Sequence, residues 1–178
     1  MNCSRSTGAD AKFERMNIRL RRSKEDDLDF VLNAEQSDEN SRYVTVWTRE
    51  QHLAAFTSKD LAHLIIETVN DGTSVGYIIL AGLEDDNQNR EFRRIVVTVK
   101  NKGYGTAALR LVKKLAFEEL GAHRLWLDVR EHNSRARHIY EREGFVVEGT
   151  MRECVRANAG FESLVLMSIL RTEYELEK

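Results

Sequence analysis

The chain contains no proline, only two cysteines and almost no excess of charge of either sign. Without proline, its turns must come from glycine, asparagine and aspartate. Cys3 and Cys154 are too far apart in the sequence to suggest a disulfide framework or a metal-binding spacing, and they predict free thiols in the reducing cytoplasm. A net charge of −2 lacks the basic excess that is typical of nucleic-acid-binding proteins, so no nucleic-acid partner is expected.

Long apolar runs are also missing. No stretch reaches the roughly 18 apolar residues that would indicate a membrane span, so no membrane partner is expected. Residues 1–15 lack the apolar core of a signal peptide, and we interpret them as a polar N-terminal extension. Residues 16–178 have the length of a single domain. The five histidines share no ligand spacing on one helical face, so no metal site is expected.

The spacing of apolar residues predicts strands and helices along the whole domain. A T-x-x-Q capping box at Thr48 and Gln51 opens one helix, and Ser23 is expected to cap another. Predicted strands cover residues 17–21, 63–69, 74–83, 92–99, 125–129, 145–150 and 161–170. Predicted helices cover residues 23–36, the segment after Thr48, residues 106–120, and a short segment that Asn133 or Ser134 caps and that ends at Glu143.

The order of these elements predicts the fold class. The joins between the early strands are too short for crossovers, which favours antiparallel neighbours. The later strands are separated by helices. The expected class is therefore α/β (α+β), with a mixed, mostly antiparallel central sheet and helices on both faces.

The most informative segment is a glycine-containing loop between a predicted strand and a predicted helix. Gly103 and Gly105 allow positive φ angles and close approach of the backbone to a ligand. Successive N–H groups at such a loop and at a helix N-terminus bind phosphate oxygens, and Lys100 and Lys102 add positive charge. The alternative is that the glycines serve only a tight turn from strand to helix.

The same loop also fits the dinucleotide fingerprint G-x-G-x-x-A, with Asp128 20 residues after Ala108. That fingerprint belongs to the first strand and turn of a doubly wound parallel sheet. Here about ninety residues with an apparent hairpin come first, and about fifty remain after Asp128. We therefore reject a dinucleotide site and interpret Asp128 as a strand-end residue.

Two blocks of residues resemble the GNAT superfamily of acetyltransferases. The segment K-N-K-G-Y-G from Lys100 to Gly105 is similar to its Arg/Gln-x-x-Gly-x-Gly/Ala loop, with lysine in the basic position and without the usual preceding proline. The later pattern N-x-x-A-x-x-x-Y-x-x-x-G-F runs from Asn133 to Phe145. Glu148-Gly149 and the late Met167-x-Ile169-Leu170 resemble the branch that acetylates ribosomal-protein N-termini and spermidine-type polyamines. The resemblance implies a GNAT-like sheet of about seven strands that splays open beside the loop.

The resemblance also implies how acetyl-CoA binds as co-substrate. Its pyrophosphate would lie on the loop from Lys102 to Thr106, and its pantetheine arm along a strand edge. A backbone N–H near Val96 or Val97 would polarise the thioester carbonyl. Asn133 would either hydrogen-bond the pantetheine or serve only as a helix cap. The expected cofactor-binding residues are Ile95, Val96, Val97, Lys102, Gly103, Tyr104, Gly105, Thr106, Asn133 and Arg137.

For catalysis, the resemblance implies that Tyr140 protonates the leaving thiolate as general acid, with packing of a buried aromatic as the alternative. Glu91 is the candidate base, through a water molecule, or else an exposed strand-end charge. Tyr43 and Trp47 border the acceptor cleft by the same resemblance, or simply pack. The acidic residues Glu35, Asp38 and Glu39 are candidates to attract a cationic acceptor, or else form a solvated face.

The predicted activity is therefore transfer of the acetyl group of acetyl-CoA to a primary amine by direct attack in a ternary complex. The acceptor would be a protein N-terminus or a small polyamine-type amine. The alternative is a non-catalytic acyl-CoA-binding sensor, which would keep the glycine loop but would not need Tyr140. The resemblance also implies a homodimer, since members of this family are commonly dimeric.

Overall fold

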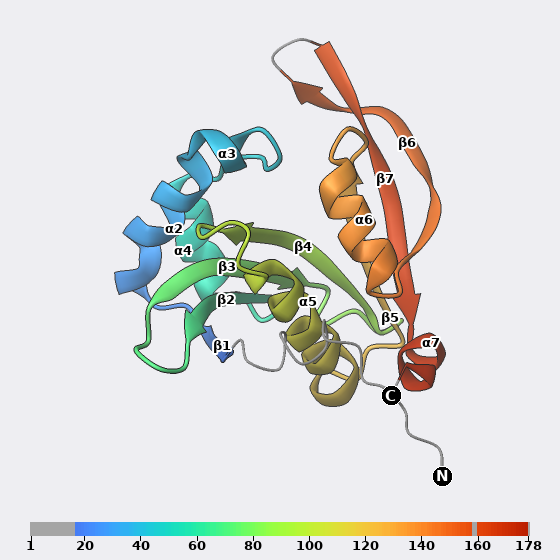
Figure 1. Ribbon diagram of the computed structural model, residues 1–178, viewed down its shortest axis with the longest axis horizontal. Helices are drawn as coiled ribbons and strands as arrows, with labels where there is room; N and C mark the ends of the chain where they lie inside the picture. Colours follow the sequence, from blue (N-terminus) through green and yellow to red (C-terminus); the bar gives the residue numbers. More distant parts are fainter. Residues whose placement is uncertain (1–16, 158–159, 178) are drawn as a thin grey trace.

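The computed structural model describes residues 17–157 and 160–177, in which the predicted mixed sheet is present (Figure 1). The predicted extension, residues 1–15, lies outside the described residues. Seven strands form one sheet in the order β1-β2-β3-β4-β5-β7-β6. The strands are β1 (Ile18–Arg22), β2 (Leu61–Thr68), β3 (Ser74–Ala81), β4 (Asn89–Val97), β5 (Arg124–Arg130), β6 (Val146–Ala157) and β7 (Gly160–Leu170).

Helices precede, separate and follow the strands. They are the 3₁₀ turn η1 (Glu25–Asp27), α2 (Leu28–Gln36), α3 (Asp38–Ser41), α4 (Arg49–Thr57), α5 (Tyr104–Lys114), the π-helical turn η2 (Leu115–Glu119), α6 (Ser134–Arg142) and α7 (Arg171–Leu176). The predicted capping box is present at α4, where Thr48 and Gln51 each bond the other's backbone N–H. In the described part of the chain, no helix is long and apolar enough to cross a membrane.

All neighbouring strands run antiparallel except β4 and β5, which are parallel. The connections from β2 to β3 and from β3 to β4 are too short to cross over the sheet, so each joins an antiparallel pair. The connection from β4 to β5 is instead a crossover through α5, which a parallel pair needs. The crossover places the glycine loop at the end of β4 that lies away from its pairing with β5.

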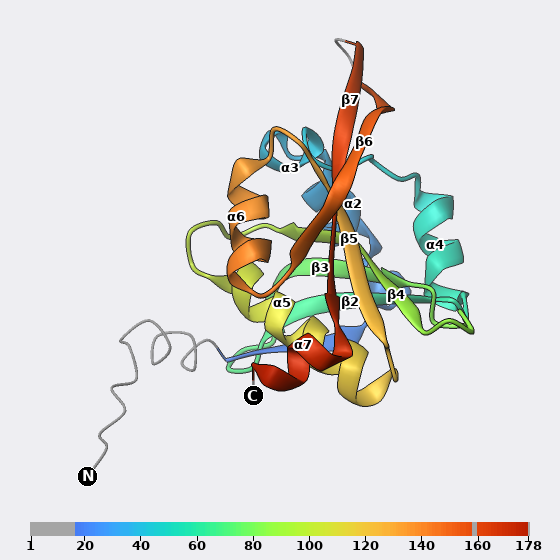
Figure 2. The same ribbon diagram turned by 90° about the vertical axis from the view of Figure 1, so that its right-hand side faces the viewer.

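Helices cover both faces of the sheet, as predicted, and Figure 2 shows α6 and α4 on opposite sides. The larger core lies under α5 and α6. It includes Leu109 and Val112 of α5, packed against strand residues such as Ile78 and Leu127. The smaller core lies under α2, where Val31 meets Ile65, Tyr77 and Val96. The apolar faces of α5 and of α2 are therefore buried against the two faces of the sheet.

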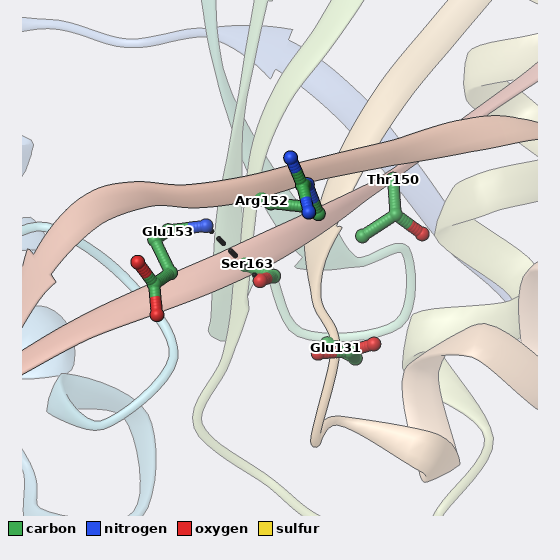
Figure 3. Close-up of a pocket in the computed structure, with 5 residues that line it drawn as sticks. All are labelled: Glu131, Thr150, Arg152, Glu153 and Ser163. Carbon is green, nitrogen blue, oxygen red and sulfur yellow. Dashed lines mark hydrogen bonds between the residues drawn. The ribbon is translucent and has the colours of Figure 1, made fainter.

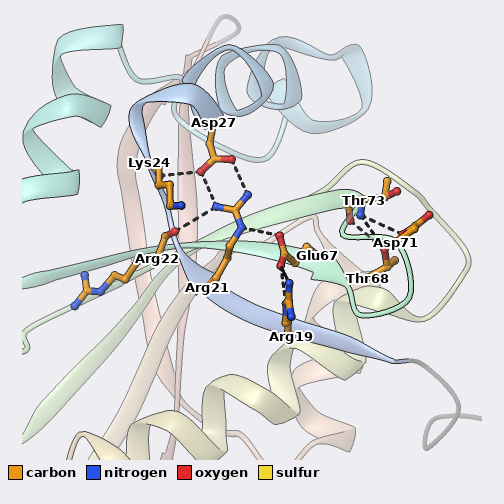
Figure 4. A network of polar contacts seen from close by, with 9 residues as sticks. All are labelled: Arg19, Arg21, Arg22, Lys24, Asp27, Glu67, Thr68, Asp71 and Thr73. Atoms are coloured by element: carbon orange, nitrogen blue, oxygen red, sulfur yellow. Dashed lines mark hydrogen bonds and ion pairs between the residues drawn. The ribbon is translucent and has the colours of Figure 1, made fainter.

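An ion-pair network fastens the first strand to its neighbours (Figure 4). Arg21 donates to Glu67 of β2 at 2.6 Å and to both oxygens of Asp27 at 2.7 and 2.8 Å. Arg19 donates to the same Glu67 at 2.6 Å. The side chain of Glu67 is nearly buried, so these hydrogen bonds compensate a carboxylate that has lost its hydration.

Several predicted boundaries are wrong, each for a physical reason. Ser23 does not cap a helix, because its hydroxyl lies 2.7 Å from Nδ1 of His63, and helical structure begins after Lys24. The predicted helix 106–120 begins at Tyr104 and changes to a π-helical turn at Leu115. The strand predicted at 92–99 begins three residues earlier, at Asn89. Helices α3 and α7 were not predicted, being too short to show a period.

The last hairpin is much longer than predicted. Strand β6 continues to Ala157 rather than ending at Thr150, and with β7 it extends beyond the rest of the sheet (Figure 1). Its register shifts twice, between Val147 and Gly149 and between Met151 and Val155. The predicted turn at residues 158–160 falls largely outside the described residues.

Candidate active site

The central feature of the site is the divergence of two neighbouring strands. Parallel pairing of β4 with β5 begins at Asn89 with Arg124 and ends at Glu91 with Trp126. Past Glu91, β4 continues for six residues. Five of them pair with β3 alone, and the register shift between Ile79 and Leu80 leaves Arg93 without a partner on β3. The edge of β4 that faces β5 is therefore available to hydrogen-bond an extended ligand, as the resemblance implies for Ile95, Val96 and Val97. Val96 is buried, whereas the side chains of Ile95 and Val97 are half-buried against the larger core.

The glycine loop stands at the far end of this open edge. Gly103 has φ +81° and is the N-cap of α5, without any side-chain cap. A residue with a Cβ rarely adopts that conformation. The first intrahelical bond runs from Ala107 N to Gly103 O, so the N–H groups of Tyr104, Gly105 and Thr106 have no acceptor within the helix. Three converging amides and a helix N-terminus fit a pyrophosphate, and Lys102 is exposed beside them.

Lys100 takes a role that the sequence did not predict. Its ammonium group donates to Oδ1 of Asn40, and this hydrogen bond connects the glycine loop to α3. Burial and the nearby charge of Arg135 lower the pKa of Lys100. Lys100 is therefore engaged with Asn40, and Lys102, which is exposed, is the lysine available to an anion.

Helix α6 forms the second wall of the opening. Asn133 is its N-cap and accepts a 3.2 Å hydrogen bond from Ala136 N. Its side-chain NH₂ group can still donate, so the two interpretations of Asn133 are compatible. Arg137 points toward the turn after β5, where its Nη1 lies 3.5 Å from Glu131 O. The arginines that reach the glycine loop are instead Arg135 and Arg142.

Tyr140 lies on α6 at the inner end of the opening. Its ring packs edge-on against Phe92 of β4, with centroids 6.4 Å apart, and against Phe145 at 5.9 Å. Burial, and to a smaller extent the charge of Asp128, raise the pKa of Tyr140 above its usual value. The hydroxyl is therefore protonated at neutral pH, which a general acid requires.

Two carboxylates lie on the sheet beside the point of divergence. Glu91 is bound by Arg93, whose Nε and Nη2 donate to it at 3.1 and 2.6 Å. Asp128 of β5, which the sequence led us to interpret as a strand-end residue, keeps an exposed side chain, while partial desolvation beside the sheet and the negative charge of Glu91 raise its pKa. The charge of Asp128 also contributes to the raised pKa of Tyr140, which makes Asp128 a second candidate for the proton transfers.

A buried polar cluster connects α2 to strands β3 and β4. Glu35 is fully buried and accepts hydrogen bonds from Tyr77, Arg94 and the N–H of Trp47. Arg94 in turn donates to Thr45 O at 2.7 Å and lies 4.5 Å from the Trp47 ring. The suggestion that Glu35 attracts a cationic acceptor is therefore wrong, because its carboxylate is shielded from solvent and already neutralised.

A pocket lies beside the β6–β7 hairpin, lined by Glu131, Thr150, Arg152, Glu153 and Ser163 (Figure 3). Its one internal hydrogen bond runs from Glu153 N to Ser163 Oγ at 3.1 Å. None of the predicted catalytic or cofactor-binding residues lines it. In the described residues, no group of three or more histidine, cysteine, aspartate or glutamate side chains is placed to hold a metal ion.

Known proteins resemble this chain in sequence and in structure. A spermidine N(1)-acetyltransferase of Escherichia coli K12 is 27% identical over 171 residues, which cover 90% of this chain and 89% of that protein. A putative ribosomal N-acetyltransferase of Bacillus subtilis, YdaF, is 36% identical over 109 residues, 61% of this chain and 60% of that protein. The crystal structure of spermidine N-acetyltransferase from Vibrio cholerae in complex with CoA and spermine shares the fold, with a TM-score of 0.81 at 22% identity over 89% of this chain and 98% of that one.

The family model of the acetyltransferase (GNAT) domain matches residues 17–146, a span from β1 to the start of β6. That span includes the open edge of β4, the glycine loop and α6. The resemblance inferred from the two sequence blocks is confirmed, and this chain belongs to the acetyltransferase (GNAT) family.

Proposed function

We propose that the chain transfers the acetyl group of acetyl-CoA to a primary amine of a small, polyamine-type cation. The observation that carries the proposal is the divergence of β4 from β5 past Glu91, with the glycine loop at one end and Tyr140 at the other. The spermidine acetyltransferase relatives, one of which aligns over 90% of the chain, support this acceptor class over a protein N-terminus.

The glycine loop, the free edge of β4 and helix α6 would each bind a different part of acetyl-CoA. The amides of residues 103–106 and Lys102 would hold the pyrophosphate, and the free edge at Ile95–Val97 would pair with the pantetheine arm. The thioester carbonyl then lies near the N–H groups at Val96 or Val97, which stabilise negative charge as the amine attacks. Asn133 would donate to the pantetheine while its oxygen caps α6.

Tyr140 would protonate the departing thiolate. A thiol has a pKa near 8.5, and tyrosine is ordinarily near 10. The raised pKa of Tyr140 makes this proton transfer more uphill, but it also keeps the hydroxyl protonated over a wide pH range. The cost is about 2 kcal/mol at the ordinary pKa of tyrosine and larger at the raised one, and it remains below a typical chemical barrier.

The acceptor must lose a proton before it can attack. An alkylamine with a pKa near 10 is neutral only about once in a thousand molecules at pH 7. Glu91 is engaged by Arg93, whereas the charge of Glu91 raises the pKa of Asp128. A carboxylate with a raised pKa is a stronger base, so we assign proton removal to Asp128, with Glu91 sustaining its basicity.

This assignment predicts unequal effects of two isosteric substitutions. Asp128→Asn should lower kcat/KM for the amine by at least about tenfold, because the proton acceptor is lost. Glu91→Gln should have a smaller effect and should move the acidic limb of the pH–rate profile to lower pH, since the pKa of Asp128 falls when the neighbouring charge is removed. Steady-state kinetics from pH 5 to 9 test this, and a larger loss for Glu91→Gln would return the base role to Glu91.

The experiment that tests the function is a thiol-release assay. The purified full chain is mixed with acetyl-CoA and, in turn, spermidine, spermine, a peptide with a free N-terminus, and no acceptor. Acceptor-dependent release of CoA with the polyamines supports the proposal. Release with the peptide alone would move the acceptor class to protein N-termini. Binding of acetyl-CoA by calorimetry without release for any amine would favour the non-catalytic sensor.

The proposal extends to the cellular location of the enzyme and to its assembly. An acetyl-CoA-dependent reaction and the free, exposed thiol of Cys154 suit the cytoplasm. A homodimer is the assembly that we propose, and neither nucleic acid nor membrane is proposed as a partner.

A further inference from the structure

Helix α6 places two arginines on the glycine loop. Arg135 Nη2 donates to Oδ1 of Asn101 at 2.8 Å, at the start of the loop. Arg142 Nη2 lies 3.4 Å from Oγ1 of Thr106, in the first turn of α5. The two arginines are seven residues apart, so they share one helical face and are separated by about 10 Å along the axis.

The acceptors of both arginines are neutral groups. Among the ion pairs of the described residues, none involves Arg135 or Lys102. Arg142 reaches Oε1 of Glu143 only at 3.9 Å, and that carboxylate is already held by Arg110 at 2.8 and 3.0 Å. The side chain of Arg142 is 49% exposed. These guanidinium groups are therefore positioned by an amide and a hydroxyl, which a phosphate would displace readily.

The co-substrate carries more anionic charge than the loop itself accounts for. CoA has a pyrophosphate and, on the ribose, a separate 3′-phosphate. The amides of residues 103–106 suit one phosphate group or a pyrophosphate, but they offer nothing to a second, separate dianion. Arginine binds such a phosphate with two parallel hydrogen bonds, and the α6 face places two arginines directly beside the loop.

We propose that Arg135 and Arg142 of α6 bind the 3′-phosphate of CoA and let the protein distinguish CoA from dephospho-CoA. The inference rests on the proposed function, because it assumes that the pyrophosphate lies on the glycine loop. It assigns to α6 a recognition task distinct from those of Asn133 and Tyr140, which face the pantetheine and the thioester.

Isothermal titration calorimetry with CoA and with dephospho-CoA tests the proposal on the full chain. The wild type should bind CoA at least about tenfold more tightly, since hydrogen bonds to a charged group are the strong ones. Arg135→Gln and Arg142→Gln should each weaken CoA binding by about tenfold while leaving dephospho-CoA affinity within about twofold. The control is Arg156→Gln, which removes the same charge from an exposed position on β6 and should alter neither affinity.

Two results would overturn the proposal. Equal affinity of the wild type for CoA and dephospho-CoA would show that the 3′-phosphate is not bound. Equal loss of both affinities in the variants would place the arginines on the pyrophosphate instead. Turnover of acetyl-CoA by the wild type is measured in parallel, so that a protein that discriminates between the two ligands without acetylating any amine contradicts only the proposed function.

Discussion

At the scale of single residues, Tyr140 is the most direct test of the chemistry. Tyr140→Phe removes only the hydroxyl and keeps the ring between Phe92 and Phe145. Turnover should fall by at least about tenfold with little change in the thermal midpoint, because a positioned acid contributes at least that factor. Tyr174→Phe, a matched loss of a hydroxyl on α7, should leave turnover unchanged. A Tyr140→Phe enzyme with wild-type kcat would remove Tyr140 from the mechanism.

Residue identities predicted some roles well and others poorly. The positive φ of Gly103 and a cap at Asn133 or Ser134, of which the structure has Asn133, were predictable because they depend on a few adjacent residues. Glu35 was misread because its partner Arg94 lies 59 positions away. Arg135 and Arg142 were overlooked because an arginine on an exposed helix looks the same whether it meets solvent or a neighbouring loop.

At the scale of elements, strand β4 shapes most of the candidate site. It pairs with β3 on one side, begins the parallel pair with β5 on the other, and then leaves that edge open. Its β-branched residues predicted a strand, and the resemblance to the family implied that its edge binds the pantetheine arm, which stays a prediction. Its divergence from β5 could not be predicted from its own residues, since it depends on how α5 and α6 pack beneath the sheet.

The spacing between β3 and β4 should be sensitive to one methyl group. A Cβ at Gly76 would lie 2.3 Å from Val96 O, on the strand that would bind the thioester. Gly76→Ala should therefore displace β4, weaken binding of acetyl-CoA and lower the free energy of unfolding by roughly 1–3 kcal/mol. Gly149→Ala is the control, because a Cβ there meets nothing within 4 Å. Calorimetry and chemical denaturation measure both effects, and wild-type CoA affinity in Gly76→Ala would contradict the prediction.

At the scale of the whole molecule, the buried polar cluster makes global stability depend on pH. Burial, with the charges of His52 and Arg94, lowers the pKa of His63 from 6.5 to about 3. The unfolded chain therefore binds a proton that the folded chain does not between these values, and stability falls as the pH drops below 6.5. Although burial opposes it, the neighbouring His52, whose Nε2 lies 3.4 Å from Glu35 Oε1, the hydrogen bond from Tyr77 and the charge of Arg94 lower the pKa of Glu35 from 4.5 to about 2. Its contribution is present above pH 4.5 and is lost toward pH 2.

We therefore expect the free energy of unfolding to decline from about pH 6.5, by up to about 1.4 kcal/mol per pH unit for His63 alone. His63→Gln should flatten the curve between pH 6.5 and 5, whereas the exposed His138→Gln should leave its slope unchanged. Urea denaturation at a series of pH values measures this dependence. A slope in that range that is unaffected by His63→Gln would show that other groups cause it.

The family, the glycine loop, the cap of α4 and the class of fold could be predicted from the sequence, and the cap of α6 was narrowed to Asn133 or Ser134. Each of these features depends on residues that are neighbours along the chain. Tertiary packing, in contrast, fixes where β4 leaves β5, which carboxylate influences the pKa of Tyr140, and which arginines of α6 contact the loop. Those outcomes depend on contacts between residues tens of positions apart, whose energies are set by the packing of helices on both faces of the sheet and not by any local pattern.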